Sequence, residues 1–156
     1  MPTVRLQVSP TPAHVRTARL VTSAVARRSR LADGALDEIR LAVGEACSRA
    51  VSLHQQYAPD ELITVLLSDE GKFVVTVCDS APVGAQTGSS DRLDFLADDG
   101  TVPAVDTDRL PSVLGMAVID GLVDDLEISS ASGGSGTVIR MSWPLAVQAE
   151  SQLSDR

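Results

Sequence analysis

The fold of this chain is decided by the stretch Asp37-Glu38-Ile39-Arg40-Leu41-Ala42-Val43-Gly44-Glu45-Ala46-Cys47-Ser48-Arg49-Ala50-Val51. From Leu36, just before this stretch, apolar residues recur at intervals of three and four, namely Leu36, Ile39, Val43, Ala46, Cys47 and Ala50. This period predicts one helix between Leu36 and Val51 with one face in the core. Glu45 and Arg49 are four residues apart, so their side chains can meet on this helix. Taken alone, they suggest an exposed ion pair worth about 0.3–0.5 kcal/mol.

The elements on either side follow from periodicity and turn residues. We expect a strand over 4–8, a helix over 12–28, strands over 62–67 and 72–79, a helix over 113–122, and strands over 125–130 and 136–143. In the first helix, Leu20 and Ala24 are expected to widen the apolar face. Glu70-Gly71 and Gly133-Gly134 predict tight hairpin turns. Strands joined by hairpins, with helices on one face, predict an α+β two-layer sandwich with a mostly antiparallel sheet.

The chain length of 156 residues suits one domain, which we place at residues 1–146. Residues 80–111 have no regular period and predict an irregular lid region. This region contains six aspartates: Asp91, Asp94, Asp98, Asp99, Asp106 and Asp108. Residues 147–156 predict a flexible polar tail.

Composition excludes several classes of function. A net charge of −8 argues against direct binding of nucleic acid, which requires a basic surface. No apolar run approaches the roughly 18 residues of a membrane span. The N-terminus lacks the apolar core of a signal peptide, so we expect a cytoplasmic protein.

The cysteines and histidines do not predict a metal site. Cys47 and Cys78 both lie in apolar surroundings, and we expect buried free thiols rather than a disulfide. His14 and His54 are far apart in the sequence and are expected at the surface or at a helix edge.

The order of elements and four segments resemble the GHKL (histidine-kinase-like) ATPases, and within them the RsbW and SpoIIAB group of anti-sigma factors. The segments are residues 37–51, Val75-Thr76-Val77-Cys78-Asp79, the stretch from Leu114 to Asp125, and Gly136-Thr137-Val138-Ile139-Arg140. The resemblance covers roughly residues 3–145. It implies a two-layer sandwich of the GHKL, or Bergerat, type.

The resemblance assigns chemistry to the helix at 37–51. Glu45 falls where the family has the acid that acts as, or near, the catalytic base. One turn later the family has an asparagine whose oxygen binds Mg²⁺, and this chain has Arg49. A guanidinium has five donors and no acceptor, so it cannot ligate Mg²⁺, which requires oxygen. We therefore expect no metal site here. Arg49 could pair with Glu45 or bind a phosphate directly.

The remaining nucleotide-binding candidates lie at strand ends and in a glycine-containing loop. Asp79 matches the aspartate that accepts a hydrogen bond from the adenine amino group, although turn capping is the ordinary role of such a residue. The glycines expected after it are replaced by Ala81 and Val83. Gly115 matches a phosphate-side glycine, and Thr137 matches a threonine lining the adenine end. Gly133-Gly134-Ser135-Gly136 is better explained as a hairpin turn than as a phosphate cradle, because no Lys-Ser/Thr follows.

The resemblance implies an anti-sigma regulator that sequesters a sigma factor and is released by a STAS-type anti-anti-sigma factor. The changes at Arg49, Ala81 and Val83 predict weak or lost kinase activity, doubtful ATP binding and no Mg²⁺. The implied partner face, which also forms the homodimer in the family, is the segment from Pro12 to Arg30. One alternative is an active serine kinase of the antagonist with Glu45 as base. Another is a nucleotide-sensing module without catalysis.

Overall fold

The computed structural model describes residues 3–82 and 118–146. Within them the elements are β1 (Val4–Val8), α1 (Pro12–Arg28), α2 (Ala35–Tyr57), β2 (Ile63–Ser68), β3 (Lys72–Cys78), β4 (Asp125–Ser130) and β5 (Thr137–Pro144). Residues 118–122 form a short helical segment before β4. The predicted strands and the helix predicted over 12–28 are confirmed to within a residue or two, and the helix predicted between Leu36 and Val51 is confirmed but continues to Tyr57. Residue Gly115, the first part of the predicted helix over 113–122, residues 83–111 and the predicted tail lie outside the described residues.

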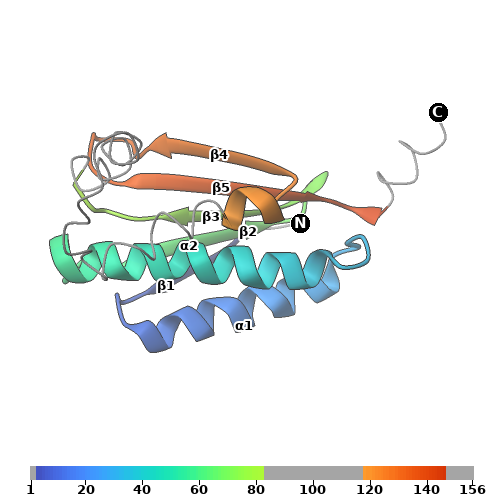
Figure 1. Ribbon diagram of the computed structural model, residues 1–156, viewed down its shortest axis with the longest axis horizontal. Helices are drawn as coiled ribbons and strands as arrows, with labels where there is room; N and C mark the ends of the chain where they lie inside the picture. Colours follow the sequence, from blue (N-terminus) through green and yellow to red (C-terminus); the bar gives the residue numbers. More distant parts are fainter. Residues whose placement is uncertain (1–2, 83–117, 147–156) are drawn as a thin grey trace, which may run out of the picture.

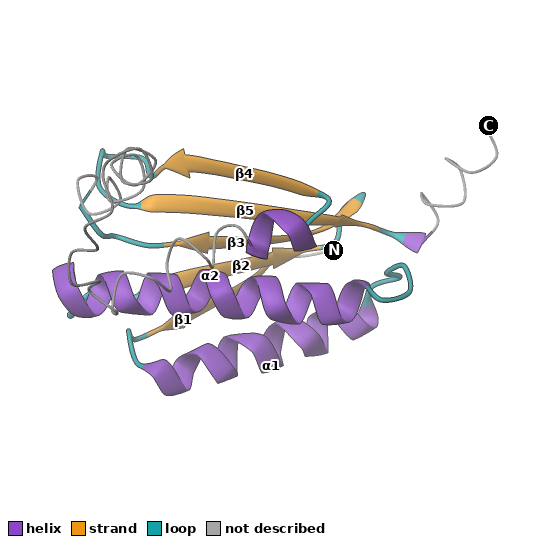
Figure 2. Cartoon of the chain, viewed as in Figure 1, coloured by secondary structure: helices purple, strands orange, loops and turns teal. Residues whose placement is uncertain are grey.

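One sheet and two helices build the fold. The strands lie in the order β1-β2-β3-β5-β4, and every neighbouring pair is antiparallel. Both long helices lie on the same side of the sheet (Figures 1 and 2). This arrangement confirms the predicted α+β sandwich. Among residues 3–82 and 118–146, no helix combines the length and apolarity of a membrane span.

The core lies between the sheet and α2. Alternate residues of the strands face the helices and are buried, as the two-residue period of a strand requires: Ile63, Val65, Leu67, Phe73, Val75, Val77, Ile139, Met141 and Trp143. Helix α2 covers them with small and branched side chains, including Ile39, Val43, Ala46 and Ala50. The indole N–H of Trp143 donates to the carbonyl oxygen of Leu122 at 3.0 Å. This bond joins the short helical segment to β5.

Helix α1 packs through small side chains rather than large ones. Its buried residues are Ala18, Thr22, Ser23 and Ala26. The Arg40 Nε of α2 donates to the Ser23 hydroxyl at 3.1 Å, which joins the two helices. The expectation that Leu20 and Ala24 widen the buried face is wrong, because both are exposed and Leu20 keeps 61% of its surface in solvent. The helix therefore presents an apolar residue outward.

Candidate functional site

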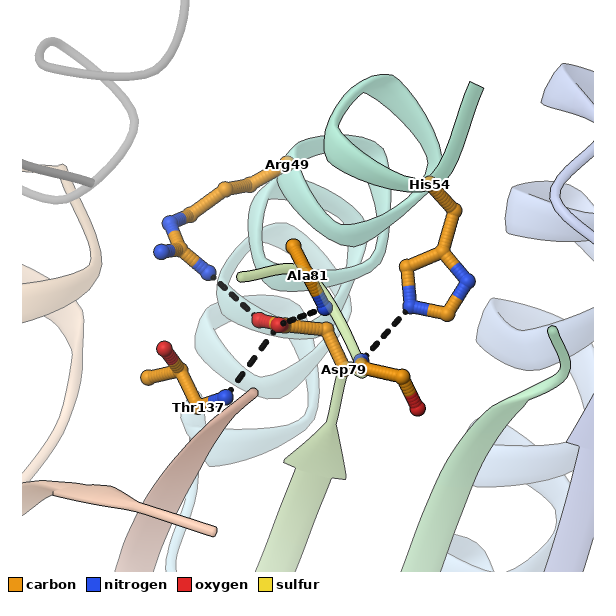
Figure 3. Close-up of polar contacts among 6 residues, drawn as sticks. Arg49, His54, Asp79, Ala81 and Thr137 are labelled. Carbon is orange, nitrogen blue, oxygen red and sulfur yellow. Dashed lines mark hydrogen bonds and ion pairs between the residues drawn. The ribbon is translucent and has the colours of Figure 1, made fainter. Parts of the chain in front are cut away.

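Asp79 follows β3 directly and lies where that strand meets α2 and the start of β5 (Figure 3). Its side chain is 2% exposed. Oδ1 accepts hydrogen bonds from the backbone N–H groups of Ala81 at 3.1 Å and Thr137 at 3.2 Å. Oδ2 accepts from the Arg49 guanidinium at 3.1 Å. The bond to Ala81 is the turn-capping contact expected of an aspartate after a strand. The other two bonds connect the loop to α2 and to β5.

Arg49 pairs with Asp79 and not with Glu45. Its side chain is 11% exposed, so both members of the ion pair are largely shielded from water. Of the two alternatives for Arg49, pairing with Glu45 is wrong, because α2 directs Arg49 toward the end of β3. Phosphate binding by Arg49 stays a prediction. Glu45 is half-buried and makes no hydrogen bond or ion pair with another described residue. Glu45 and Arg49 therefore do not act as a pair, although they lie one turn apart on α2.

His54 is a buried member of the same site. It is fully buried, so the expectation of a surface or helix-edge histidine is wrong. Its Nδ1 lies 3.0 Å from the Glu61 carbonyl oxygen, and its Nε2 lies 2.9 Å from the Ser80 backbone nitrogen. A carbonyl can only accept and an N–H can only donate, so these partners assign the neutral imidazole with its proton on Nδ1. His54 therefore holds the residue next to Asp79 against α2.

The loop after β3 is also fixed to the turn between β4 and β5. The Asp79 N–H donates to the Thr137 carbonyl at 2.9 Å, and the Ser135 hydroxyl donates to the Ser80 carbonyl at 3.3 Å. Gly136 adopts φ 101°, and a Cβ at this position would overlap the Asp79 carbonyl oxygen. The glycine-rich segment is the turn of the β4–β5 hairpin, as predicted, and its last glycine permits this close approach.

The electrostatics of the site are internally balanced. A carboxylate offers about four lone-pair positions, and three on Asp79 are filled by Arg49, Ala81 and Thr137. Burial raises the pKa of the neighbouring Cys78 thiol; the charge of Asp79 raises it further, and Arg5 opposes the shift. Cys78 is half-buried rather than buried as expected, and both cysteines are free. Among residues 3–82 and 118–146, no three His, Cys, Asp or Glu side chains gather in a way that could hold a metal ion.

A second feature is a groove of about 330 Å³ between α1 and α2. It is lined by Pro12, Val15, Arg16, Arg19, Ser48, Val51, Ser52 and Gln55. The aliphatic stem of Arg19 lies across α2 at Gly44, where a Cβ would come within 3.2 Å of the arginine Cδ. The lining of the groove therefore combines three apolar side chains with polar ones, and α1 contributes two guanidinium groups to it.

The structure brings together three of the five candidate residues, namely Arg49, Asp79 and Thr137. Glu45 lies one turn from Arg49 on α2 without joining them. Gly115 lies outside the described residues. Sequence reasoning missed His54 and Gly136 as parts of the site. The one available signal for Gly136 was its place beside Thr137, since glycine at a strand start often marks a close backbone approach.

Comparisons with known proteins agree with this fold. A family model described as Histidine kinase-like ATPase domain matches residues 8–143. The crystal structure of the RsbU and RsbW domains of Rv1364c from Mycobacterium tuberculosis is similar, with a TM-score of 0.62 and 17% identity; the match covers 93% of this chain and 33% of that chain. The SiaB–SiaC complex from Pseudomonas aeruginosa is similar with a TM-score of 0.60 and 11% identity, covering 89% of this chain and 88% of that chain.

The identities and coverages of these matches determine what each comparison shows. This chain spans about a third of the Mycobacterium tuberculosis chain that it matches. At these identities the similarity to both structures concerns the fold. A search of curated proteins gives no match. The family model, in contrast, extends from β1 to β5. On that ground, this chain belongs to the histidine kinase-like ATPase domain family.

Proposed function

We propose that this chain is a partner-switching regulator of the anti-sigma type. It binds a sigma factor stoichiometrically, keeps it from RNA polymerase, and releases it when a STAS-type antagonist competes. The family assignment and the similarity to an RsbW domain and to the SiaB–SiaC complex support this proposal.

The observation that carries the proposal is the outward face of α1. We call the exposed residues Arg16, Arg19, Leu20, Ala24, Arg27 and Arg28 the α1 surface. Helix α1 carries four arginines and no acidic residue, although the chain as a whole has a net charge of −8. An exposed leucine among arginines suits a partner helix with apolar and acidic side chains, because such a pair is complementary in both apolar character and charge.

The proposal includes weak or lost kinase activity. The family implies a nucleoside triphosphate with Mg²⁺, and the described residues do not fit this pair well. Arg49 offers no oxygen to a metal ion. Asp79 is the acceptor expected for the amino group of the nucleotide's adenine base. It is already bonded to Arg49 and to two backbone N–H groups. Both facts support regulation by occupancy rather than by phosphoryl transfer.

The proposal is tested by reconstitution with defined partners. The purified full chain is mixed with each sigma factor of its source organism, and complexes are detected by size-exclusion chromatography with light scattering. We expect a complex of fixed stoichiometry with one sigma factor, which a STAS-domain protein from the same organism dissociates without ATP. If no sigma factor binds at micromolar concentrations, the proposed function is wrong.

A second candidate, an active serine kinase, is favoured by one observation. Glu45 is half-buried and has no partner among the described residues, so its carboxylate is available as a base. Radiolabelled ATP, Mg²⁺ and the STAS-type antagonist test this candidate. Robust Mg²⁺-dependent labelling that is lost in Glu45→Ala but kept in Glu38→Ala would establish the kinase. Glu38 is a suitable control because it is an exposed acid on the same helix.

A further inference from the structure

We infer that Arg49 acts as an internal plug. Its guanidinium occupies the position on Asp79 that the amino group of a nucleotide base would otherwise take, and so prevents nucleotide binding. A nucleotide is taken as the excluded ligand because the chain belongs to an ATPase family, and this step rests on the proposed function. Arg49 would thereby convert an ATPase-type fold into a protein that binds partners without binding a nucleotide.

The contact has the chemistry of the ligand that it replaces. A guanidinium nitrogen and the 6-amino group of adenine are both planar N–H donors and both suit a carboxylate acceptor, whereas guanine has a carbonyl oxygen at that position. The Arg49 nitrogen lies 3.1 Å from Asp79 Oδ2, within the range of a hydrogen bond. Figure 3 shows the guanidinium and the Thr137 N–H on the same carboxylate, reached from α2 and from β5. A base would have to displace Arg49 to reach this oxygen.

Displacement is unfavourable because the pair is shielded from water. The two side chains are 11% and 2% exposed. Removing one partner from a shielded ion pair leaves the other charge without compensation, which costs much more than breaking a surface pair. No acidic side chain among the described residues other than Asp79 pairs with Arg49. A neutral nucleoside offers Arg49 no anion in exchange, so it cannot open the site.

The surrounding bonds keep Asp79 in place for this contact. Backbone N–H groups of Ala81 and Thr137 hold Oδ1, and His54 holds the following residue, Ser80. None of these bonds involves Arg49. A chain without the guanidinium should therefore keep its carboxylate in position, with Oδ2 freed. The plug is predicted to be removable without loss of the recognition group.

The experiment compares Arg49→Asn and Arg49→Ala with the wild-type chain by isothermal titration calorimetry. The probes are adenosine, ATP and GTP without Mg²⁺. We expect no saturable binding of adenosine to the wild type at millimolar concentrations. In both variants we expect adenosine and ATP to bind at least tenfold more tightly than to the wild type, with GTP much weaker. Adding Asp79→Asn to Arg49→Ala should abolish the gain.

Arg40→Ala is the matched control. Arg40 is also an arginine of α2, and its side chain bonds to Ser23 and Asp37 instead of to the site. The Arg40→Ala variant loses the same charge as the Arg49 variants and should gain no affinity for adenosine or ATP. Circular dichroism and thermal melts establish that each variant is folded. If both Arg49 variants are unfolded, NMR of the wild type decides: the Arg49 Nε–H signal should not move when millimolar adenosine or ATP is added.

The outcomes separate the plug from its alternatives. Weaker ATP binding in Arg49→Ala than in the wild type would make Arg49 a phosphate ligand and overturn the inference. Folded Arg49 variants that bind adenosine no better than the wild type would also overturn it, as would a moving Arg49 Nε–H signal. Sigma-factor binding is measured separately on the wild type. Its failure would remove the proposed function but leave a gain of adenosine binding in place.

Discussion

At the scale of single residues, Gly136 is a described position that has no room for a side chain. Its φ of 101° disfavours any side chain, and a Cβ would overlap the Asp79 carbonyl. Gly133 has a similar φ of 105° but open space around it. We expect Gly133→Ala to lower the free energy of unfolding by about 1–2 kcal/mol, and Gly136→Ala by roughly 1–3 kcal/mol more because of the overlap. Urea denaturation of both variants measures the difference, and equal losses would contradict the close approach.

Cys47 provides a prediction on pH. Burial raises the pKa of its thiol from 9.0 to about 12. The folded chain therefore keeps a proton that the unfolded chain loses, so the stabilisation is complete below pH 9 and is lost as pH rises toward 12. The loss is about 1.4 kcal/mol per pH unit in this window. Urea denaturation between pH 8.5 and 10.5 should show this extra slope in the wild type relative to Cys47→Ala. Parallel slopes would mean that the thiol is not buried as described.

At the scale of elements, α2 connects the core to the site through His54. The buried imidazole bonds to the Glu61 carbonyl and to the Ser80 N–H, so its removal leaves a cavity and two backbone groups without these partners. We expect His54→Ala to lower the free energy of unfolding by roughly 3 kcal/mol. The control is His14→Ala, which removes a half-buried histidine bonded only to Ser9 and should cost less than about 1 kcal/mol. Chemical denaturation distinguishes the two, and similar losses would contradict the connecting role.

The elements were predictable from the sequence, but the contacts between them were not. Helix α2 has a clear apolar period, and the strands alternate, so local pattern sufficed for both. The partner of Arg49 lies 30 residues away, and pattern on one helix favoured the nearer Glu45 instead. His54 was misplaced for the same reason, since its partners come from two loops. Leu20 was assigned to the apolar face yet is exposed, because α1 buries only the narrower face formed by Ala18, Thr22, Ser23 and Ala26.

At the scale of the whole molecule, charge is distributed unevenly. The chain carries 21 acidic and 13 basic residues, yet α1 holds four arginines and no acid. The chain as a whole repels an acidic partner, whereas helix α1 attracts it. Electrostatic attraction at such a patch speeds association by factors of about 10 to 1,000 and weakens with added salt. In the proposed complex, the α1 surface should therefore set the association rate more than the lifetime of the complex.

Charge reversal tests this distribution in the proposed complex. Arg16→Glu with Arg19→Glu changes the net charge from −8 to −12, since each substitution contributes −2. We expect the association rate to fall about tenfold at low salt, with a smaller effect at high salt. Arg5→Glu with Arg140→Glu gives the same net charge at two exposed residues on strands β1 and β5, whose side chains point away from the helices. Stopped-flow or biolayer measurements compare the two. Both double variants carry the same net charge and therefore repel an acidic partner equally at long range. Equal slowing would show that only the total charge matters. Slowing confined to Arg16→Glu with Arg19→Glu would place the encounter on α1.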